Sequence, residues 1–96
     1  MREYELIVIV HPDLDENAFN DVIERVRGWI GDLGGEVAKT DIWGKRKMAY
    51  PIRKQTEGQY VLMHTKMKAT TGAQLERNLR FLEPIMRFSI VAKASE

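Results

Sequence analysis

The order of two kinds of hydrophobic periodicity restricts the fold of this 96-residue chain more than any other feature of its sequence. Residues 4–10, 36–53, 59–67 and 85–93 have the alternating or β-branched apolar content that is typical of strands. Apolar residues at helical spacing occur between the first two of these segments and between the last two. The order strand, helix, strand, strand, helix, strand predicts an α+β, ferredoxin-like βαββαβ sandwich.

This order also predicts the arrangement of the sheet. Right-handed crossovers place the first and third strands at the centre of a four-stranded antiparallel sheet and the second and fourth at its edges. Both helices then cover one face, and the other face is left open. We expect residues 1–96 to form this single domain, because a second domain would be too small to bury a core of its own.

The sequence predicts where the first helix starts and ends and which residues form its apolar stripe, the face that packs against the sheet. Asp13 acting with Glu16, or Asp15 alone, supplies the capping oxygen. A glycine pair at 34–35 ends the helix, because glycine adopts the left-handed cap conformation at little cost. Its apolar stripe consists of Phe19, Val22, Ile23, Val26, Ile30 and Leu33.

The second helix is expected to be short and amphipathic, with Thr70 or Thr71 as its cap. Its stripe consists of Leu75, Leu79 and Leu82, and the strand that follows is expected to run to Lys93. Residues 94–96 are expected to be a frayed end.

The second strand, residues 36–53, is too long for a small sheet to pair along its whole length, since strands rise about 3.3 Å per residue. We therefore expect a kink or bulge near Gly44, and part of the strand protruding as an arm. Pro51 cannot donate to a strand ladder, which predicts an edge position. Residues 55–58 are expected to form the turn into the third strand.

Alternation assigns the faces of the strands. Phe88 and Ile90, in the same alternating set as Met86 and Ala92, are predicted to lie under the helices. On the third strand, Val61, Met63 and Met67 are predicted to face the core. The open face is expected to receive Arg87, Ser89 and Lys93 from strand four, Tyr60, Leu62, His64 and Lys66 from strand three, and Ile7 and Ile9 from strand one. The open face is therefore too apolar to be exposed only to water, and we expect it to contact another molecule.

Composition narrows the class of protein. Lys plus Arg is 15 and Asp plus Glu is 14, and the chain has no cysteine, which fits a reducing compartment such as the cytoplasm. The longest apolar run, Leu6 to Val10, is far shorter than the roughly 20 residues of a membrane-spanning helix. We expect no membrane association, no secretion signal, and a mature protein that comprises the whole chain.

An enzymatic function finds little support in the residues. His11 and His64 lie in different elements with no partner at a motif spacing, so no catalytic residues and no metal site are predicted. Five acids within residues 13–24 suit helix capping better than cation binding. The glycines match no phosphate-binding loop, so neither a cofactor nor a small-molecule substrate is expected.

Charge is distributed unevenly along the chain. Residues 39–54 contain six basic residues and one acid, and residues 66–93 contain six basic residues and two acids. Such a surface attracts phosphate although the net charge is only +1. Lys45 to Lys47 could merely protect an exposed edge strand from aggregation. That explanation leaves Trp43 and Tyr50, beside the cluster, without a role, whereas aromatic residues among cations suit either RNA or a protein interface.

The run Trp43-Gly44-Lys45-Arg46-Lys47-Met48-Ala49-Tyr50-Pro51-Ile52 is the most specific motif of the chain. With Tyr4-Glu5, His11-Pro12 and Glu57-Gly58-Gln59-Tyr60-Val61, it resembles the bacterial small-subunit ribosomal protein six family over residues 2 to about 91. Met48 stands where that family usually has leucine.

The resemblance implies a non-enzymatic, ferredoxin-like ribosomal protein. It would bind the central domain of small-subunit rRNA and pair with small-subunit ribosomal protein eighteen. The residues that the resemblance and the charge pattern together predict for RNA binding are Arg2, Lys45, Arg46, Lys47, Arg53, Lys54, Arg87 and Lys93. Those predicted for the partner are Trp43, Tyr50, Tyr60, Leu62 and His64.

Other functions of the same topology remain open at this point. A free-standing RNA-recognition domain would need an aromatic motif on the third strand that residues 59–64 lack. An acyl-phosphate hydrolase would need an anion cradle after the first strand, where residues 12–16 are acidic instead. A regulatory dimer that pairs edges or open faces is a further alternative.

Overall fold

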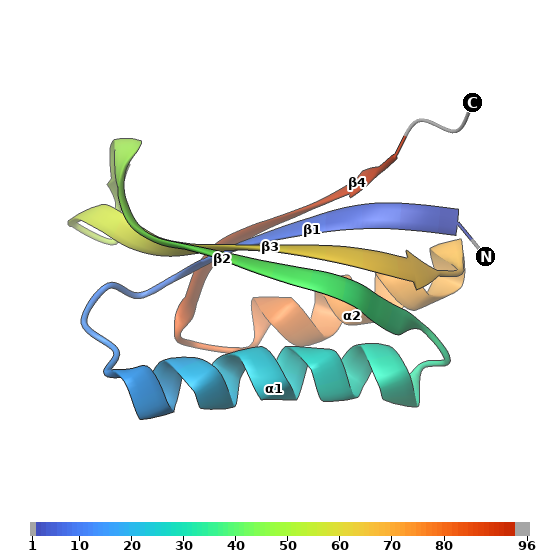
Figure 1. Ribbon diagram of the computed structural model, residues 1–96. Coiled ribbons are helices and arrows are strands. Elements are labelled where there is room, and N and C mark those ends of the chain that lie inside the picture. Colours follow the sequence, from blue (N-terminus) through green and yellow to red (C-terminus); the bar gives the residue numbers. More distant parts are fainter. Residues whose placement is uncertain (1, 94–96) are drawn as a thin grey trace.

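The predicted ferredoxin-like topology is confirmed in the computed structural model, which describes residues 2–93 (Figure 1). The strand order is β2-β3-β1-β4, all neighbours are antiparallel, and both helices lie on one face of the sheet. The expected frayed end at 94–96 lies outside the described residues. The elements are β1 (Arg2–Val10), α1 (Glu16–Asp32), β2 (Glu36–Ile52), β3 (Gln55–Met67), α2 (Ala69–Arg80) and β4 (Ile85–Ala92).

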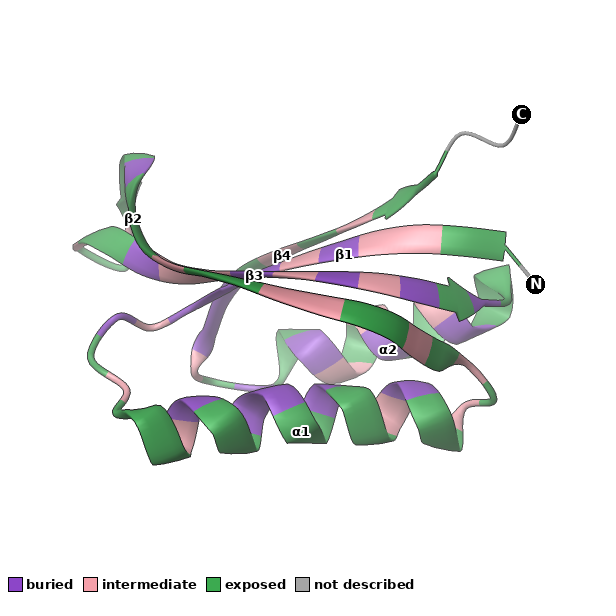
Figure 2. Ribbon diagram, in the orientation of Figure 1, coloured by how far each residue is buried: buried purple, intermediate pink, exposed green. Residues whose placement is uncertain are grey.

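The core lies between the helices and one face of the sheet, as the alternation predicts. Buried side chains from every second position of β1 and β3 meet the buried stripes of α1 and α2 (Figure 2). Phe88 and Ile90 pack against this cluster from β4. Fully burying a side chain of this size contributes about 1.5–3 kcal/mol, so this single cluster is the main source of stability. It includes Leu6, Val8, Val10, Val26, Ile30, Val61, Met63, Met67, Leu75 and Leu79.

Asp15 alone caps α1, so the alternative in which Asp13 acts with Glu16 is wrong. The Asp15 Oδ1 accepts a hydrogen bond from the Ala18 N–H at 2.8 Å. Gly34, at φ +88°, follows the helix as predicted. Leu33, expected in the stripe, is the C-terminal cap residue.

Replacing Asp15 by alanine is expected to lower the free energy of unfolding by about 1 kcal/mol, because a backbone donor of the first turn loses its acceptor. Urea denaturation followed by circular dichroism measures this change. Asp13→Ala is the matched control, because it removes the same charge two residues away without removing a cap. An equal loss in both variants would show that the charge matters and the capping hydrogen bond does not.

The predicted threonine cap of α2 is wrong. Lys68 occupies the cap position and provides no capping side-chain hydrogen bond. Thr71 lies inside the helix, buried, and its hydroxyl donates to the Leu33 carbonyl at 3.1 Å. The hydroxyl therefore joins the start of α2 to the end of α1. Its acceptor lies 38 positions away in the sequence, so local sequence does not predict this hydrogen bond. Leu82 is buried in the core beyond the end of the helix.

The turn between β2 and β3 is Arg53-Lys54 and not residues 55–58. Both residues have positive φ, 51° and 65°, which is typical of the two-residue turns that match the twist of a hairpin. The prediction of a turn over residues 55–58 is wrong, because Gly58 is not a turn residue. It lies instead within β3, where it is buried.

The predicted kink and edge position of β2 are confirmed. Gly44 has φ +83°, and the pairing register with β3 shifts between Ile42 and Gly44. Pro51 lies in a stretch of β2, between Lys47 and Ile52, that has no partner in β3. Figure 1 shows that the end of this hairpin bends away from the plane of the sheet.

The hairpin protrudes as the predicted arm (Figure 1), and contacts near its end also hold it to the sheet. Met48 near its end is buried against Ile9 and Met86. The Arg53 guanidinium donates to the carbonyls of Glu83 at 2.8 Å and Ile85 at 3.4 Å. The hairpin is therefore held against the start of β4.

The same packing explains why Met86 does not lie under the helices. A register shift between Ile9 and Val10 lets Ile85 join the helix-side core, while Met86 joins Ile9 and Met48 in a second cluster. A bulge of this kind inserts one residue into the alternation and reverses the faces on one side of it.

Candidate nucleic-acid and partner interface

The open face is built from side chains that the strand registers place in rows across the sheet. One row joins Lys39, His64, Glu5 and Val91 across all four strands. The next contains Ile7, which pairs with Leu62 on β3 and with Ser89 on β4. These registers confirm the predicted outward direction of Leu62 and His64.

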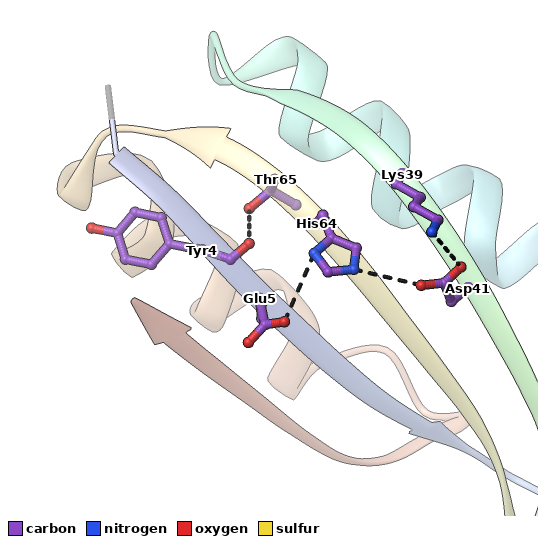
Figure 3. A network of polar contacts seen from close by, with 6 residues as sticks. All are labelled: Tyr4, Glu5, Lys39, Asp41, His64 and Thr65. Atoms are coloured by element: carbon purple, nitrogen blue, oxygen red, sulfur yellow. Dashed lines mark hydrogen bonds and ion pairs between the residues drawn. The ribbon is translucent and has the colours of Figure 1, made fainter. Parts of the chain in front are cut away.

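His64 lies at the centre of a polar network on this face (Figure 3). Its Nδ1 is 3.8 Å from the Glu5 Oε2, and its Nε2 is 3.5 Å from the Asp41 Oδ2. Lys39 Nζ lies 3.7 Å from the other oxygen of Asp41. The network links three strands, and its His64, Glu5 and Asp41 side chains are only partly exposed, so it offers a partner a defined pattern of polar groups.

An aromatic stack lies beside the bend of β2. The rings of Trp43 and Tyr60 are 6.4 Å apart and nearly parallel, with 12° between their planes. The Arg46 guanidinium lies 5.4 Å from the centre of the Trp43 ring. Trp43 and Tyr60 were predicted to contact the partner and Arg46 to contact RNA, yet the three side chains form one stack.

A second cation and aromatic pair lines a surface hollow together with Tyr60. The Arg87 guanidinium is 5.4 Å from the centre of the Tyr50 ring, which brings β4 together with the end of β2. Tyr50 is 52% exposed despite this contact. Arg87 is therefore placed beside an aromatic surface, although Tyr50 was predicted for the partner alone.

The side chains of Lys45, Arg46 and Lys47 are exposed along the hairpin. Within residues 2–93, no carboxylate lies within 4.0 Å of any of their charged groups. Their charge is therefore available to an external anion.

The predicted RNA-binding residues do not form one cluster. Lys45, Arg46, Lys47, Arg53, Lys54 and Arg87 lie at the hairpin end of the sheet. Arg2 pairs with Met67, and the Lys93 N–H donates to the Glu3 carbonyl, so both lie at the opposite end. Ile9, the partner of Arg87, lies seven positions along β1 from Arg2, which corresponds to about 23 Å of strand.

Arg80 is a basic residue that the sequence analysis did not assign to any site. It lies in the last turn of α2 and lines the same surface hollow as Arg53 and Arg87. Only the tertiary structure reveals it, since the hollow brings together residues from the turn after β2, from α2 and from β4.

Two negative findings apply to the described part of the chain. Among residues 2–93, no group of three or more His, Cys, Asp or Glu side chains is placed to hold a metal ion. None of the helices described is long and apolar enough to span a membrane.

The sheet has a ferredoxin-like topology, and its open face carries an apolar strip, a polar network and an exposed cationic hairpin. Together these features define a small binding protein of the α+β class. The family model described as "Ribosomal protein S6" matches residues 3–92, and the chain belongs to this family. The predicted family is thereby confirmed.

Relatives of known name agree with this membership. The chain is 45% identical over 91 residues to small ribosomal subunit protein bS6 of Carboxydothermus hydrogenoformans, covering 95% of each chain. It is 40% identical to the protein of the same name from Dictyoglomus turgidum, covering 100% of this chain and 99% of the relative. A crystal structure of 30S ribosomal protein S6 from Thermotoga maritima has a TM-score of 0.90 at 29% identity, covering 96% of this chain and 87% of that one.

Membership in this family makes the chain a structural component of the small ribosomal subunit and not an enzyme, as predicted. It also places the chain on the ribosome in the cytoplasm.

Proposed function

We propose that residues 1–96 act as one domain that binds the central domain of small-subunit rRNA together with small-subunit ribosomal protein eighteen. The observation that carries this proposal is the position of the cationic hairpin, which is exposed, has no internal ion pairs among the described residues, and lies beside an aromatic stack on the open face. Family membership supports the assignment to the small subunit.

The hairpin suits attachment to RNA by charge. Lys45, Arg46 and Lys47 neutralise phosphates and release counterions, so binding is expected to weaken steeply with salt. Such contacts position the protein on its RNA without reading a sequence. Because Arg2 and Lys93 lie at the far end of the sheet, an RNA that contacts both groups must follow the sheet along its length.

The open face suits a protein partner. Trp43, Tyr60, Leu62 and His64 lie on it together, and Trp43 is 42% exposed. Tryptophan and tyrosine are common anchors of interfaces, and the apolar strip of Leu62 and Ile7 would leave water when a partner docks. A partner on this face would border the hairpin, so the two proteins would present one continuous surface to the RNA.

The proposal predicts cooperative binding. A transcript of the central rRNA domain should bind the chain weakly when alone, and at least about tenfold more tightly when protein eighteen is present, which corresponds to about 1.4 kcal/mol of coupling. Filter binding or calorimetry with and without the partner measures this coupling. Tight binding by the chain alone would instead support a free-standing RNA-binding domain, and binding of neither RNA nor partner would contradict the proposal.

A further inference from the structure

Two hollows adjoin each other where the hairpin meets β4. The first, of about 330 Å³, is lined by aromatic and apolar side chains that include Tyr50, Tyr60 and Met48. The second, of about 290 Å³, is lined by Arg53, Arg80 and Arg87 together with apolar residues. Arg87 lines both hollows, so they adjoin each other at this residue. An aromatic site and a three-arginine site therefore share one boundary.

The arginine hollow retains hydrogen-bond donors for an anion. A guanidinium has five N–H donors, and Arg53 uses two nitrogens on the carbonyls of Glu83 and Ile85, which fixes its position. Arg80 donates from one nitrogen to the Glu76 carboxylate at 2.7 Å. That pair lies four residues apart on an exposed helix surface, and such pairs are weak enough for a phosphate to replace. Arginine forks match the oxygens of a phosphate group.

The aromatic hollow offers flat surfaces at the right place for a base. Arg87 covers the Tyr50 ring on one side, and Tyr50 is still 52% exposed. Tyr60 forms a second wall and is itself held by the stack with Trp43. Met48 and Ile9 complete an apolar floor. Unpaired bases bind proteins by stacking on such side chains, whichever base is present.

We propose that the two hollows form a binding site for one unpaired nucleotide of the RNA, with its base against Tyr50 and its phosphate among Arg53, Arg80 and Arg87. The inference rests on the proposed RNA-binding function and adds to it a single-nucleotide subsite and a role for Arg80. An acidic peptide would satisfy the arginines but would leave the adjoining aromatic hollow unused. The pairing of the two hollows therefore favours a nucleotide.

The test is a titration of the ¹⁵N-labelled full chain, followed by amide NMR spectra, with adenosine monophosphate, adenosine, inorganic phosphate and a capped tetraglutamate peptide. Adenosine monophosphate is expected to shift the amides of residues 49–53 and 85–88 and of Arg80, and to bind more tightly than adenosine or phosphate. Tyr50→Leu and Arg80→Gln should each weaken it about tenfold, since stacking on an aromatic residue or an arginine contact is worth that factor.

Arg77→Gln is the matched control, because it removes an equal charge from an exposed position on the same helix that does not line the hollow. Equal weakening by Arg77→Gln and Arg80→Gln would overturn the proposal. Shifts spread over all basic residues, or tetraglutamate binding at the same amides as tightly as the nucleotide, would also overturn it.

Failure of the nucleotide-site proposal is distinguishable from failure of the proposed rRNA-binding function. The nucleotide titration uses no rRNA and no partner, whereas the cooperative binding experiment depends on both. If the chain binds rRNA cooperatively but does not bind the nucleotide, only the single-nucleotide site is refuted. Nucleotide binding without rRNA binding refutes the ribosomal role of the hairpin and leaves the subsite in place.

Discussion

Replacing Lys45, Arg46 and Lys47 together by alanine is expected to weaken binding to rRNA, in the presence of protein eighteen, on the order of a hundredfold at 0.1 M salt. Each lost phosphate contact removes about 0.7–0.9 from the slope of log affinity against log salt, so the slope should fall by about 2 to 3. The three side chains are exposed and have no internal carboxylate partner within residues 2–93. Nearly all of their charge is therefore available to the RNA.

The matched control removes the same three charges elsewhere. Arg25, Lys68 and Arg77 are exposed residues of α1, the α2 cap position and α2, on the side of the sheet away from the open face. Their replacement by alanine should leave the salt slope nearly unchanged. If both triple variants lose the same slope, general charge attracts the RNA and the hairpin has no special role.

The hairpin variant should remain folded. Arg46 contributes a cation and aromatic contact with Trp43, which at an exposed site is worth about 0.5–1 kcal/mol. None of the three residues belongs to either apolar cluster. A thermal midpoint close to that of the unmodified chain would assign the loss of affinity to the contacts and not to unfolding.

The parts of the fold that could be predicted from sequence are those that depend on one buried face. Alternation along β3 placed Val61 and Met63 in the core and Tyr60 and Leu62 outside, because a strand covered on one side must separate its side chains in this way. The spacing of the α1 stripe indicated its buried positions for the same reason.

The errors occurred where a residue responds to a contact that is distant in sequence. Met86 changes face because a bulge lies opposite Ile9, and Thr71 bonds to Leu33 instead of capping its own helix. Neither contact affects the periodicity of apolar residues along the sequence, so that periodicity cannot predict it. The same holds for the candidate site. Family resemblance, charge and ring type predict its residues one by one, while their grouping into stacks and hollows depends on how the hairpin meets β4.

Gly58 shows how closely the hairpin fits the sheet. A Cβ at this position would lie 2.4 Å from the Ile9 Cγ2, which is closer than two non-bonded carbon atoms can approach, and 3.7 Å from the Met48 Sδ. Ile9 is 8% exposed and is packed against Met48 and Met86, so it has little room to move. The glycine is needed here because of the close approach of β1, and its backbone dihedral plays no part.

Gly58→Ala is therefore expected to lower the free energy of unfolding by about 1–3 kcal/mol, because the added methyl group overpacks the cluster. Urea denaturation measures the loss. Gly28→Ala is the control with the opposite sign, since a Cβ there meets nothing within 4 Å and alanine favours a helix by about 0.5–1 kcal/mol over glycine.

A double-mutant cycle with Ile9→Ala tests the stated cause. Truncating Ile9 removes the Cγ2 atom that the new methyl group would contact, so Gly58→Ala should cost less in that background than in the unmodified chain. If the two losses simply add, the contact with Ile9 is not the reason that glycine is required. Because Met48 and the cationic hairpin are held by the same cluster, the single variant should also bind rRNA less tightly, in proportion to the displacement of the hairpin from the sheet.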